Sequence, residues 1–347
     1  MAGRTTAQDV AKAAGVSPAT VSLIFHGRPG VKAETREHVL AVARELGYAR
    51  IAPDPSPAAD ETRPLLLVIF KQEGSALTEM PFFEHLVRGI TDETRRRGDH
   101  RLVVTYYYAH RDAQEQLDDL RATGCEGIIL LATEMSAADV APFETIGVPI
   151  VLLDGCFSSK PLSSVVIDNY RGAKIAVRHL AGLGHTRIGY LHCSADIKNF
   201  SERRIGFLAG IHQLNDEGAG IETAVVEAGP AMADCYLAMR EFLARNPEPP
   251  TAFFADNDHA AAHCIRALQE HGLRVPDDVS VIGFDDVEFA AGLNPPLTTM
   301  GVPKETMGAL AVKRLRDLIA GEAQGSVRVC MQPEPVIRQS TCPPRSR

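Results

Sequence analysis

The feature that most constrains the fold is an alternation of short apolar runs with helical segments between residues 64 and 290. The apolar runs form two sets: 65–70, 101–108, 127–133, 149–155 and 164–168, then 187–193, 223–229, 251–258 and 279–286. Segments with helical periodicity separate them, for example 171–182, 202–217 and 259–272. Continuous apolar strands joined by helical crossovers form parallel sheets buried on both faces. The pattern therefore predicts an α/β body of two doubly wound lobes.

Short polar side chains stand where several of these predicted strands end. They are, in chain order, Asp154, Asp168, Asn257, Asp258, Asp285 and Asp286. Ligands of open α/β sheets bind at the carboxyl ends of the strands. We therefore expect these acceptors to converge on a cleft between the lobes, an arrangement that suits a hydroxyl-rich ligand.

The first 50 residues differ in charge from the rest of the chain. They hold seven Lys and Arg against four Asp and Glu, whereas the whole chain holds 36 against 44. A small basic module on an acidic body indicates that the module works close to an anion. A DNA-binding head is the natural interpretation.

Residues 1–50 also predict three short helices. Thr6 caps the first helix, and Val10, Ala11 and Ala14 lie on one of its faces. A turn at Gly15 and Val16 follows. The third helix, over about 33–46, packs its apolar residues over the other two.

The second helix begins at the stretch SPATVS, with Ser17 as its cap and Pro18 at its first position. Val21, Ile24 and Phe25 face the first helix. The outward residues are Pro18, Ala19, Ser22 and Leu23. Ala11, the glycine four residues later (Gly15) and Val21 six residues after that have the spacing typical of a helix-turn-helix, because two helices that cross closely need small contacts. A three-helix bundle used only for docking is the alternative.

The stretch TTAQDVAKAAGVSPATVSLIFHGRPGVKAETREHVLAVARELGY resembles the headpiece of the LacI family of bacterial transcriptional regulators. The resemblance implies that SPATVS is the recognition helix in the major groove. Thr20 and Ser22 would then touch phosphates, while Ala19 and Leu23 would contact thymine methyl groups. The expected DNA-binding residues are Thr6, Ser17, Pro18, Ala19, Thr20, Ser22, Leu23, His26 and Arg28. Lys32 and Leu23 replace residue types that are frequent in the family.

Residues 51–63 form a proline-rich linker between the head (1–50) and the effector-binding core (64–347). Related repressors place a hinge helix here, whose leucine wedges into the minor groove. That leucine corresponds to Pro57 in this chain. Because neighbouring prolines oppose a helix and nearby acids oppose phosphates, we expect no wedge at Pro57.

The body resembles the same family, through VVIDNYRGAKIAVRHLAGLGHTRIGYL, RRIGF and FFADNDHAAAHCIRALQEHGLRVPDDVSVIGFDDVEFAAGLNPPLTT. The family's core in turn resembles periplasmic sugar-binding proteins. The lobes are expected at about 64–167 plus 299–328, and at about 168–298 plus 329–343. The implied effector contacts are Phe82, Asp154, Asp168, Asn199, Arg203, Asn257 and Asp285. Two further contacts that are usual in relatives are replaced here by Pro230 and Val302.

The sequence offers little for catalysis. Asp285 and Asp286 are adjacent on a strand, so they point to opposite faces and cannot flank one bond. His259 and His263 share a helix face beside Cys264, but no third metal ligand stands at a fixed spacing. There is no glycine-rich phosphate loop, no GxSxG and no HExxH. We expect no enzyme, no cofactor and no bound metal.

The sequence therefore favours a DNA-binding repressor controlled by a sugar-like small molecule. A sugar-binding receptor without a DNA role and a corepressor-dependent regulator of nucleobase or central metabolism are the alternatives. One head reads one half-site, so we expect a homodimer on double-stranded operator DNA. No leucine heptads follow residue 320, so no coiled-coil tetramer is expected. Seven scattered cysteines, no signal peptide and no membrane-spanning run predict a bacterial cytoplasmic protein, associated with the nucleoid when bound to DNA.

Overall fold

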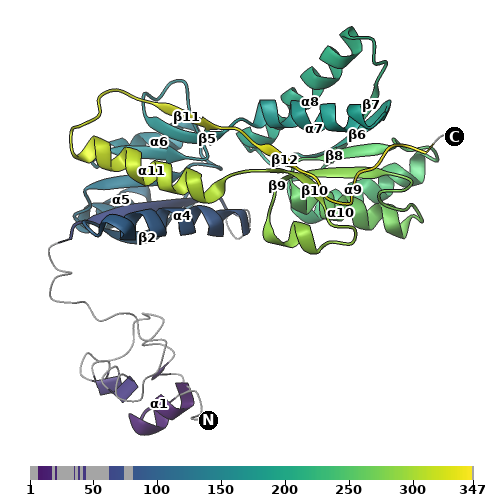
Figure 1. Ribbon diagram of the computed structural model, residues 1–347. Coiled ribbons are helices and arrows are strands. Elements are labelled where there is room, and N and C mark those ends of the chain that lie inside the picture. Colours follow the sequence, from purple (N-terminus) through teal and green to yellow (C-terminus); the bar gives the residue numbers. More distant parts are fainter. Residues whose placement is uncertain are drawn as a thin grey trace. The chain divides into compact units, whose positions relative to one another are not determined.

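The computed structural model describes residues 7–17, 20–21, 35, 38–39, 42–43, 62–73 and 81–345 (Figure 1). The chain divides into two compact units, residues 1–62 and 63–347. Among the described residues, no helix is both long and apolar enough to cross a lipid bilayer.

The N-terminal unit has a small core of its own. Helix α1 (Ala7–Ala13) buries Val10 and Ala11, and the turn after it is made by Gly15 with φ 66°. The core cluster comprises Val10, Ala11, Ala14, Val21, Val39 and Ala43. The described apolar residues of all three predicted helices therefore meet in one core.

The first lobe of the larger unit is built on a six-stranded parallel sheet in the order β11-β5-β4-β3-β1-β2. Its strands are β1 (Pro64–Lys71), β2 (Arg101–Tyr108), β3 (Gly127–Leu131), β4 (Ile150–Leu153), β5 (Ser163–Ile167) and β11 (Arg328–Met331). Its helices are α4 (Pro81–Arg97), α5 (Ala113–Ala122), α6 (Ala137–Glu144) and α11 (Lys304–Ile319).

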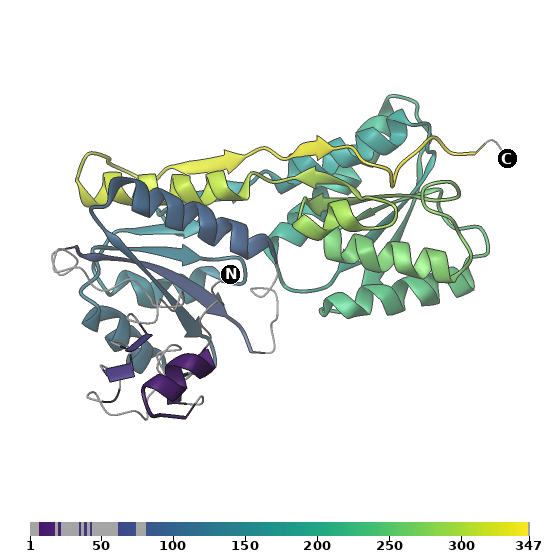
Figure 2. The same ribbon diagram turned by 60° about the horizontal axis from the view of Figure 1, so that its bottom comes forward.

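Successive side chains of β1 point to opposite faces of this sheet, as in any β-strand. Leu65 and Leu67 belong to the core cluster that contains residues of α4 and α11. Leu66 and Val68 belong to the cluster that contains residues of α5 and α6. Because both faces are covered, the strand reads as a continuous apolar run (Figure 2).

The second lobe has a six-stranded sheet in the order β12-β10-β9-β8-β6-β7. Its strands are β6 (Arg187–Cys193), β7 (Glu222–Ala228), β8 (Ala252–Ala255), β9 (Ser280–Asp285), β10 (Thr298–Gly301) and β12 (Glu334–Val336). Its helices are α7 (Asn169–Gly182), α8 (Lys198–Asp216), α9 (Met232–Arg245) and α10 (Asp258–Glu270). All pairings are parallel except that of β10 with β12.

The chain passes three times between the lobes. Two of these crossings lie a few residues closer to the C-terminus than the predicted lobe boundaries. Strand β10 pairs with β9, so 299–301 belongs to the second sheet rather than the first. Strand β11 pairs with β5, so 329–331 belongs to the first sheet rather than the second. Figure 1 shows β11 and β12 passing in succession from one lobe to the other. These short, half-exposed strands carry no continuous apolar run, so only their partners assign them to a sheet.

Candidate functional site

A small pocket lies where the carboxyl ends of the two sheets face each other. Its lining residues are Phe82, Phe83, Thr133, Asp154, Ile197, Asn199, Phe200, Arg203, Asn257 and Asp285. The first four come from the first lobe and the others from the second. The cavity measures about 40 Å³, room for only a few water molecules at about 10–15 Å³ each. The lobes are therefore closed on each other at this point.

Arg203, on α8, organises the second-lobe side of this pocket. Its side chain is 3% exposed, and Nη2 lies 3.0 Å from Asp285 Oδ1. Nε donates to Asn169 Oδ1 at 2.9 Å, and Nη1 donates to the carbonyl of Asp256. The guanidinium also lies 3.8 Å from the ring centroid of Phe284. A buried charge with this set of partners holds a fixed donor fork at the pocket wall.

Asp285 ends strand β9 in a backbone conformation that side chains rarely adopt, with φ 104°. Lys304, at the start of α11 in the first lobe, donates to the carbonyl oxygens of Asp285 and Asp286. Burial raises the pKa of Asp285, although the charges of Arg203 and Lys304 oppose the shift. The strand end is thus held by cations from both lobes.

Asp154 stands opposite, directly after β4 in the first lobe. Thr133 Oγ1 donates to its Oδ2 at 2.7 Å, and Asn199 Nδ2 of the second lobe donates to its Oδ1 at 3.0 Å. Burial raises the pKa of Asp154 to about 6. The Asn199–Asp154 hydrogen bond therefore joins the two lobes across the pocket.

Asn257 and Asp258 connect the pocket to helix α10. Asn257 caps the helix by accepting a hydrogen bond from Ala260 N at 2.8 Å. Asp258 is fully buried and accepts from Val287 N and Thr299 Oγ1. Burial, and then the charge of Asp285, raise the pKa of Asp258 to about 8. This carboxyl ties α10 to the loop that follows Asp285.

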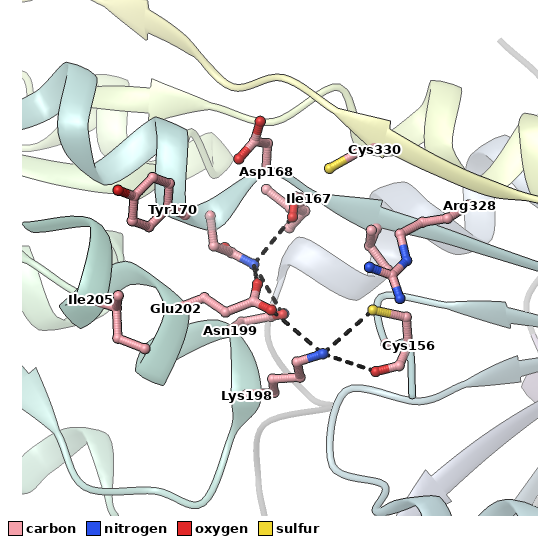
Figure 3. A pocket seen from close by; sticks show the side chains of 13 residues that line it. Cys156, Ile167, Asp168, Tyr170, Lys198, Asn199, Glu202, Ile205, Arg328 and Cys330 are labelled. Carbon is pink, nitrogen blue, oxygen red and sulfur yellow. Dashed lines mark hydrogen bonds and ion pairs between the residues drawn. The ribbon is translucent and has the colours of Figure 1, made fainter. Parts of the chain in front are cut away.

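A second pocket of about 230 Å³ adjoins the first one. Asn199 lines both pockets, and Gly155 and Cys156 of the second directly follow Asp154 of the first. Figure 3 shows Lys198 reaching across to Cys156, where its ammonium lies 3.0 Å from the carbonyl oxygen. The two lobes thus meet in hydrogen bonds at both pockets.

Comparisons with known proteins agree with this architecture. Residues 6–50 match the family described as "Bacterial regulatory proteins, lacI family", and residues 177–341 match "Periplasmic binding protein-like domain". The transcriptional regulator MalR of Streptomyces coelicolor is 33% identical over 97% of this chain and 96% of its own. The chain belongs to the LacI family of bacterial transcriptional regulators. Proteins of this family combine a helix-turn-helix domain that binds DNA with a two-lobed core.

Two solved structures of transcriptional regulators match nearly the whole chain. The transcriptional regulator CelR in complex with cellobiose has a TM-score of 0.70 and 28% identity, covering 97% of this chain and all of that one. The lac repressor dimer bound to operator and an anti-inducer has a TM-score of 0.66 and 27% identity, covering 98% and 100%.

Six of the seven effector contacts expected for this LacI-family regulator line the first pocket. Asp168 does not: its Oδ1 caps α7 by accepting from Arg171 N at 3.0 Å, and it lines the second pocket. The sequence analysis missed Phe83, Thr133, Ile197 and Phe200. Thr133 ends a predicted strand and was recognisable by that position. The other three are apolar, so nothing in the sequence separates them from core residues.

Other predicted features of the core also have definite places. Asp286 pairs with Arg338 at 2.7 Å while Asp285 pairs with Arg203, so the two neighbouring carboxylates point apart. Pro230 and Val302 line neither pocket. In the part of the chain that the structure describes, no three His, Cys, Asp or Glu residues gather to hold a metal.

In the head, the predicted cap of the second helix is visible. Ser17 Oγ accepts from Thr20 N at 3.1 Å, and Val21 N donates to the Ser17 carbonyl at 3.2 Å. The other expected DNA-contacting residues lie outside the described residues, as does Pro57: Thr6, Pro18, Ala19, Ser22, Leu23, His26 and Arg28.

Proposed function

We propose that this LacI-family regulator is a repressor whose operator affinity is controlled by a sugar bound between its two lobes. The observation that carries the proposal is the pairing of buried polar groups across the first pocket. Thr133 and Asp154 stand on one side, and Arg203, Asn257 and Asp285 on the other. Donors and acceptors in this number suit the hydroxyls around a sugar ring. The similarity to CelR, solved with cellobiose, supports a saccharide.

Binding changes the arrangement of the lobes in this mechanism. A cavity of about 40 Å³ cannot admit a sugar ring, so the lobes must separate first. A ring hydroxyl then takes the place of Asn199 on Asp154, while Arg203 and Asp285 bind the opposite edge. A ligand that contacts both lobes favours one lobe arrangement over the other, and thereby couples to the head.

We infer that two copies bind one operator. The head supplies one recognition helix, with Ser17 at its cap, and a two-fold dimer would match a palindromic site. The similarity of this chain to the lac repressor, which was solved as a dimer bound to operator, supports this assembly. Because operator DNA is the partner, the protein would act in the bacterial cytoplasm and associate with the nucleoid when bound.

A thermal-shift screen of the full-length protein with neutral sugars and sugar phosphates tests the effector. A compound that binds only the native state raises Tm, by linkage. A hit must then change operator affinity, measured by fluorescence anisotropy on labelled operator DNA. A hit that raises Tm without changing operator affinity contradicts the repressor mechanism.

A nucleobase corepressor is the second candidate, because three aromatic rings line the first pocket. Phe82 and Phe83 lie edge to face with centroids 5.3 Å apart, and Phe200 lies across from them on α8. Planar bases stack on such rings. Adenine, guanine and hypoxanthine therefore belong in the same screen, and a Tm rise with these alone would favour this candidate.

A further inference from the structure

The second pocket has a lining that the single-sugar mechanism does not use. At about 230 Å³ it is the larger of the two, and its walls come from both lobes. Figure 3 shows Tyr170 and Ile205 on one side and Arg328 with Cys156 on the other. Tyr170 is 42% exposed and Ile205 is 58% exposed, so apolar surface is available beside the polar groups.

The polar groups of this pocket have unused hydrogen-bonding capacity. The guanidinium of Arg328 makes no hydrogen bond or ion pair with any described residue, and neither does Oδ2 of Asp168. Among the described residues, only Asn169 Nδ2 donates to Glu202 Oε2, at 3.2 Å, and both residues belong to the second lobe. A ligand would therefore meet free donors and free acceptors side by side.

The charges favour a neutral ligand over an anion. Lys198 and Arg328 are balanced by Asp168 and Glu202. Lys198 already donates to the Cys156 carbonyl, and its ammonium lies 3.5 Å from Glu202 Oε1, so its positive charge is largely compensated. A phosphate or carboxylate would be attracted by Arg328 alone and repelled by both carboxylates. A polyhydroxylated ring, with hydroxyls at its edge and C–H groups on its faces, meets no such conflict and fits beside Tyr170.

Asn199 lines both pockets. In the first pocket, Asn199 Nδ2 donates to Asp154. In the second pocket, Asn199 Oδ1 accepts from Asn169 Nδ2 at 3.1 Å. When a sugar hydroxyl replaces Asn199 as the hydrogen-bond partner of Asp154, the Asn199 amide is free to contact the glycosidic oxygen that joins two sugar rings. The two cavities then form one continuous site.

We propose that the second pocket is a subsite for the second ring of a disaccharide, whose first ring occupies the pocket at Arg203. The inference rests on the proposed sugar-controlled function and extends it by naming the size and charge of the sugar. Tyr170 covers one face of the second ring, and Arg328, Asp168 and Glu202 bind its hydroxyls. Because this ring also touches both lobes, it adds to the coupling between effector and operator.

Calorimetry on the full-length protein tests the subsite. The probes are cellobiose, maltose, lactose and trehalose, with glucose and galactose as their component rings and glucose 6-phosphate as the anionic probe. At least one disaccharide should bind tenfold or more tightly than its own monosaccharides. Tyr170→Ala and Arg328→Ala should remove most of this advantage and leave monosaccharide affinity within about twofold. Leu208→Ala, on the exposed face of α8 and outside both pockets, is the control and should change neither.

Three other results would overturn the subsite, and they distinguish its failure from a failure of the proposed function. Equal affinities for a disaccharide and its monosaccharide, or equal losses for both in the variants, would overturn it while the sugar-controlled function stands. Tightest binding of glucose 6-phosphate, lost in Arg328→Ala, would make the pocket an anion site. Binding of nucleobases but of no sugar would overturn the proposed function together with the subsite.

Discussion

Arg203 joins three segments of the second lobe that are remote in sequence. Its guanidinium contacts Asn169 at the start of α7, the carbonyl of Asp256 after β8, and Asp285 at the end of β9. Its ion pair with Asp285 is buried, so truncation of either partner leaves a charge without a counter-ion. The same residue therefore supports both the folded lobe and the wall of the first pocket.

We expect Arg203→Ala and Asp285→Ala to lower the free energy of unfolding by about 3–5 kcal/mol, as for other broken buried ion pairs. Effector affinity should fall roughly 100-fold, because charged hydrogen bonds contribute about 1.5–3 kcal/mol each. Urea denaturation and calorimetry measure the two effects, with the exposed Arg240→Ala as control. Operator binding by the free protein should be nearly unchanged. Parental effector affinity in both variants would show that the pocket is assigned wrongly.

The buried carboxyl of Asp258 predicts a pH dependence of stability. Its folded pKa of about 8 lies above its ordinary value of 3.8, so the folded state holds the proton more strongly than the unfolded state. Stability therefore falls as the pH rises from about 4 through about 8, by about 1.4 kcal/mol for each unit of pKa difference.

In Asp258→Asn the amide oxygen should still accept from Val287 N, while the amide nitrogen donates to Thr299 Oγ1, and the substitution removes this titration. Urea midpoints at pH 5.5 and pH 8 should then differ less in the variant than in the parent. An equal difference in both proteins would mean that other groups cause the pH dependence.

At the scale of elements, helices α4 and α11 approach each other through paired glycines. A Cβ at Gly89 would overlap the Glu305 carbonyl, and a Cβ at Gly308 would overlap the Leu86 carbonyl. The same two helices begin at the pocket, with Phe82 on α4 and Lys304 on α11. Their close crossing therefore sets the position of two groups at the first pocket, Phe82 in its wall and Lys304 on the carbonyl of Asp285.

We expect Gly89→Ala to lower the free energy of unfolding by about 1–3 kcal/mol, the usual cost of overpacking. The helices would move apart, so effector affinity should fall as well. Gly182→Ala is the matched control: it lies in α7, and a Cβ there would meet nothing within 4 Å. This control should stabilise by about 0.5–1 kcal/mol, the helix preference for Ala over Gly. Equal effects of the two substitutions would contradict the close crossing.

At the scale of the whole molecule, one recognition helix per chain predicts a homodimer on operator DNA. Light scattering at micromolar concentration should give a particle of two chains. A stable monomer that binds operator with full affinity would contradict this prediction.

The linker sequence predicts that Pro57 does not wedge open the central base step, so operator affinity rests more on phosphate contacts by the head. The logarithm of the affinity should then fall steeply with the logarithm of salt concentration, by about 0.9 for each neutralised phosphate. Pro57→Leu should raise operator affinity and make the salt slope shallower. A kinked central step beneath a hinge helix in a complex of the parent protein would refute this.

The sequence by itself determined the class of the fold and the polar half of the site. Apolar runs of strand length, separated by helical segments, specify parallel sheets because both faces must be buried. Asp154, Asn257 and Asp285 were recognisable because each ends such a run, and the family resemblance added Phe82 and Arg203.

Only the tertiary structure decided the contacts between distant segments. It assigned β10, β11 and β12 to their sheets, because these short strands are held by partners and not by burial of their own apolar runs. It separated Asp168 from the first pocket, since that carboxylate serves as a helix cap. It also brought Phe83, Ile197 and Phe200 to the pocket wall. An apolar side chain looks the same in sequence whether it faces a core or a ligand, and the packing of the two lobes alone makes the difference.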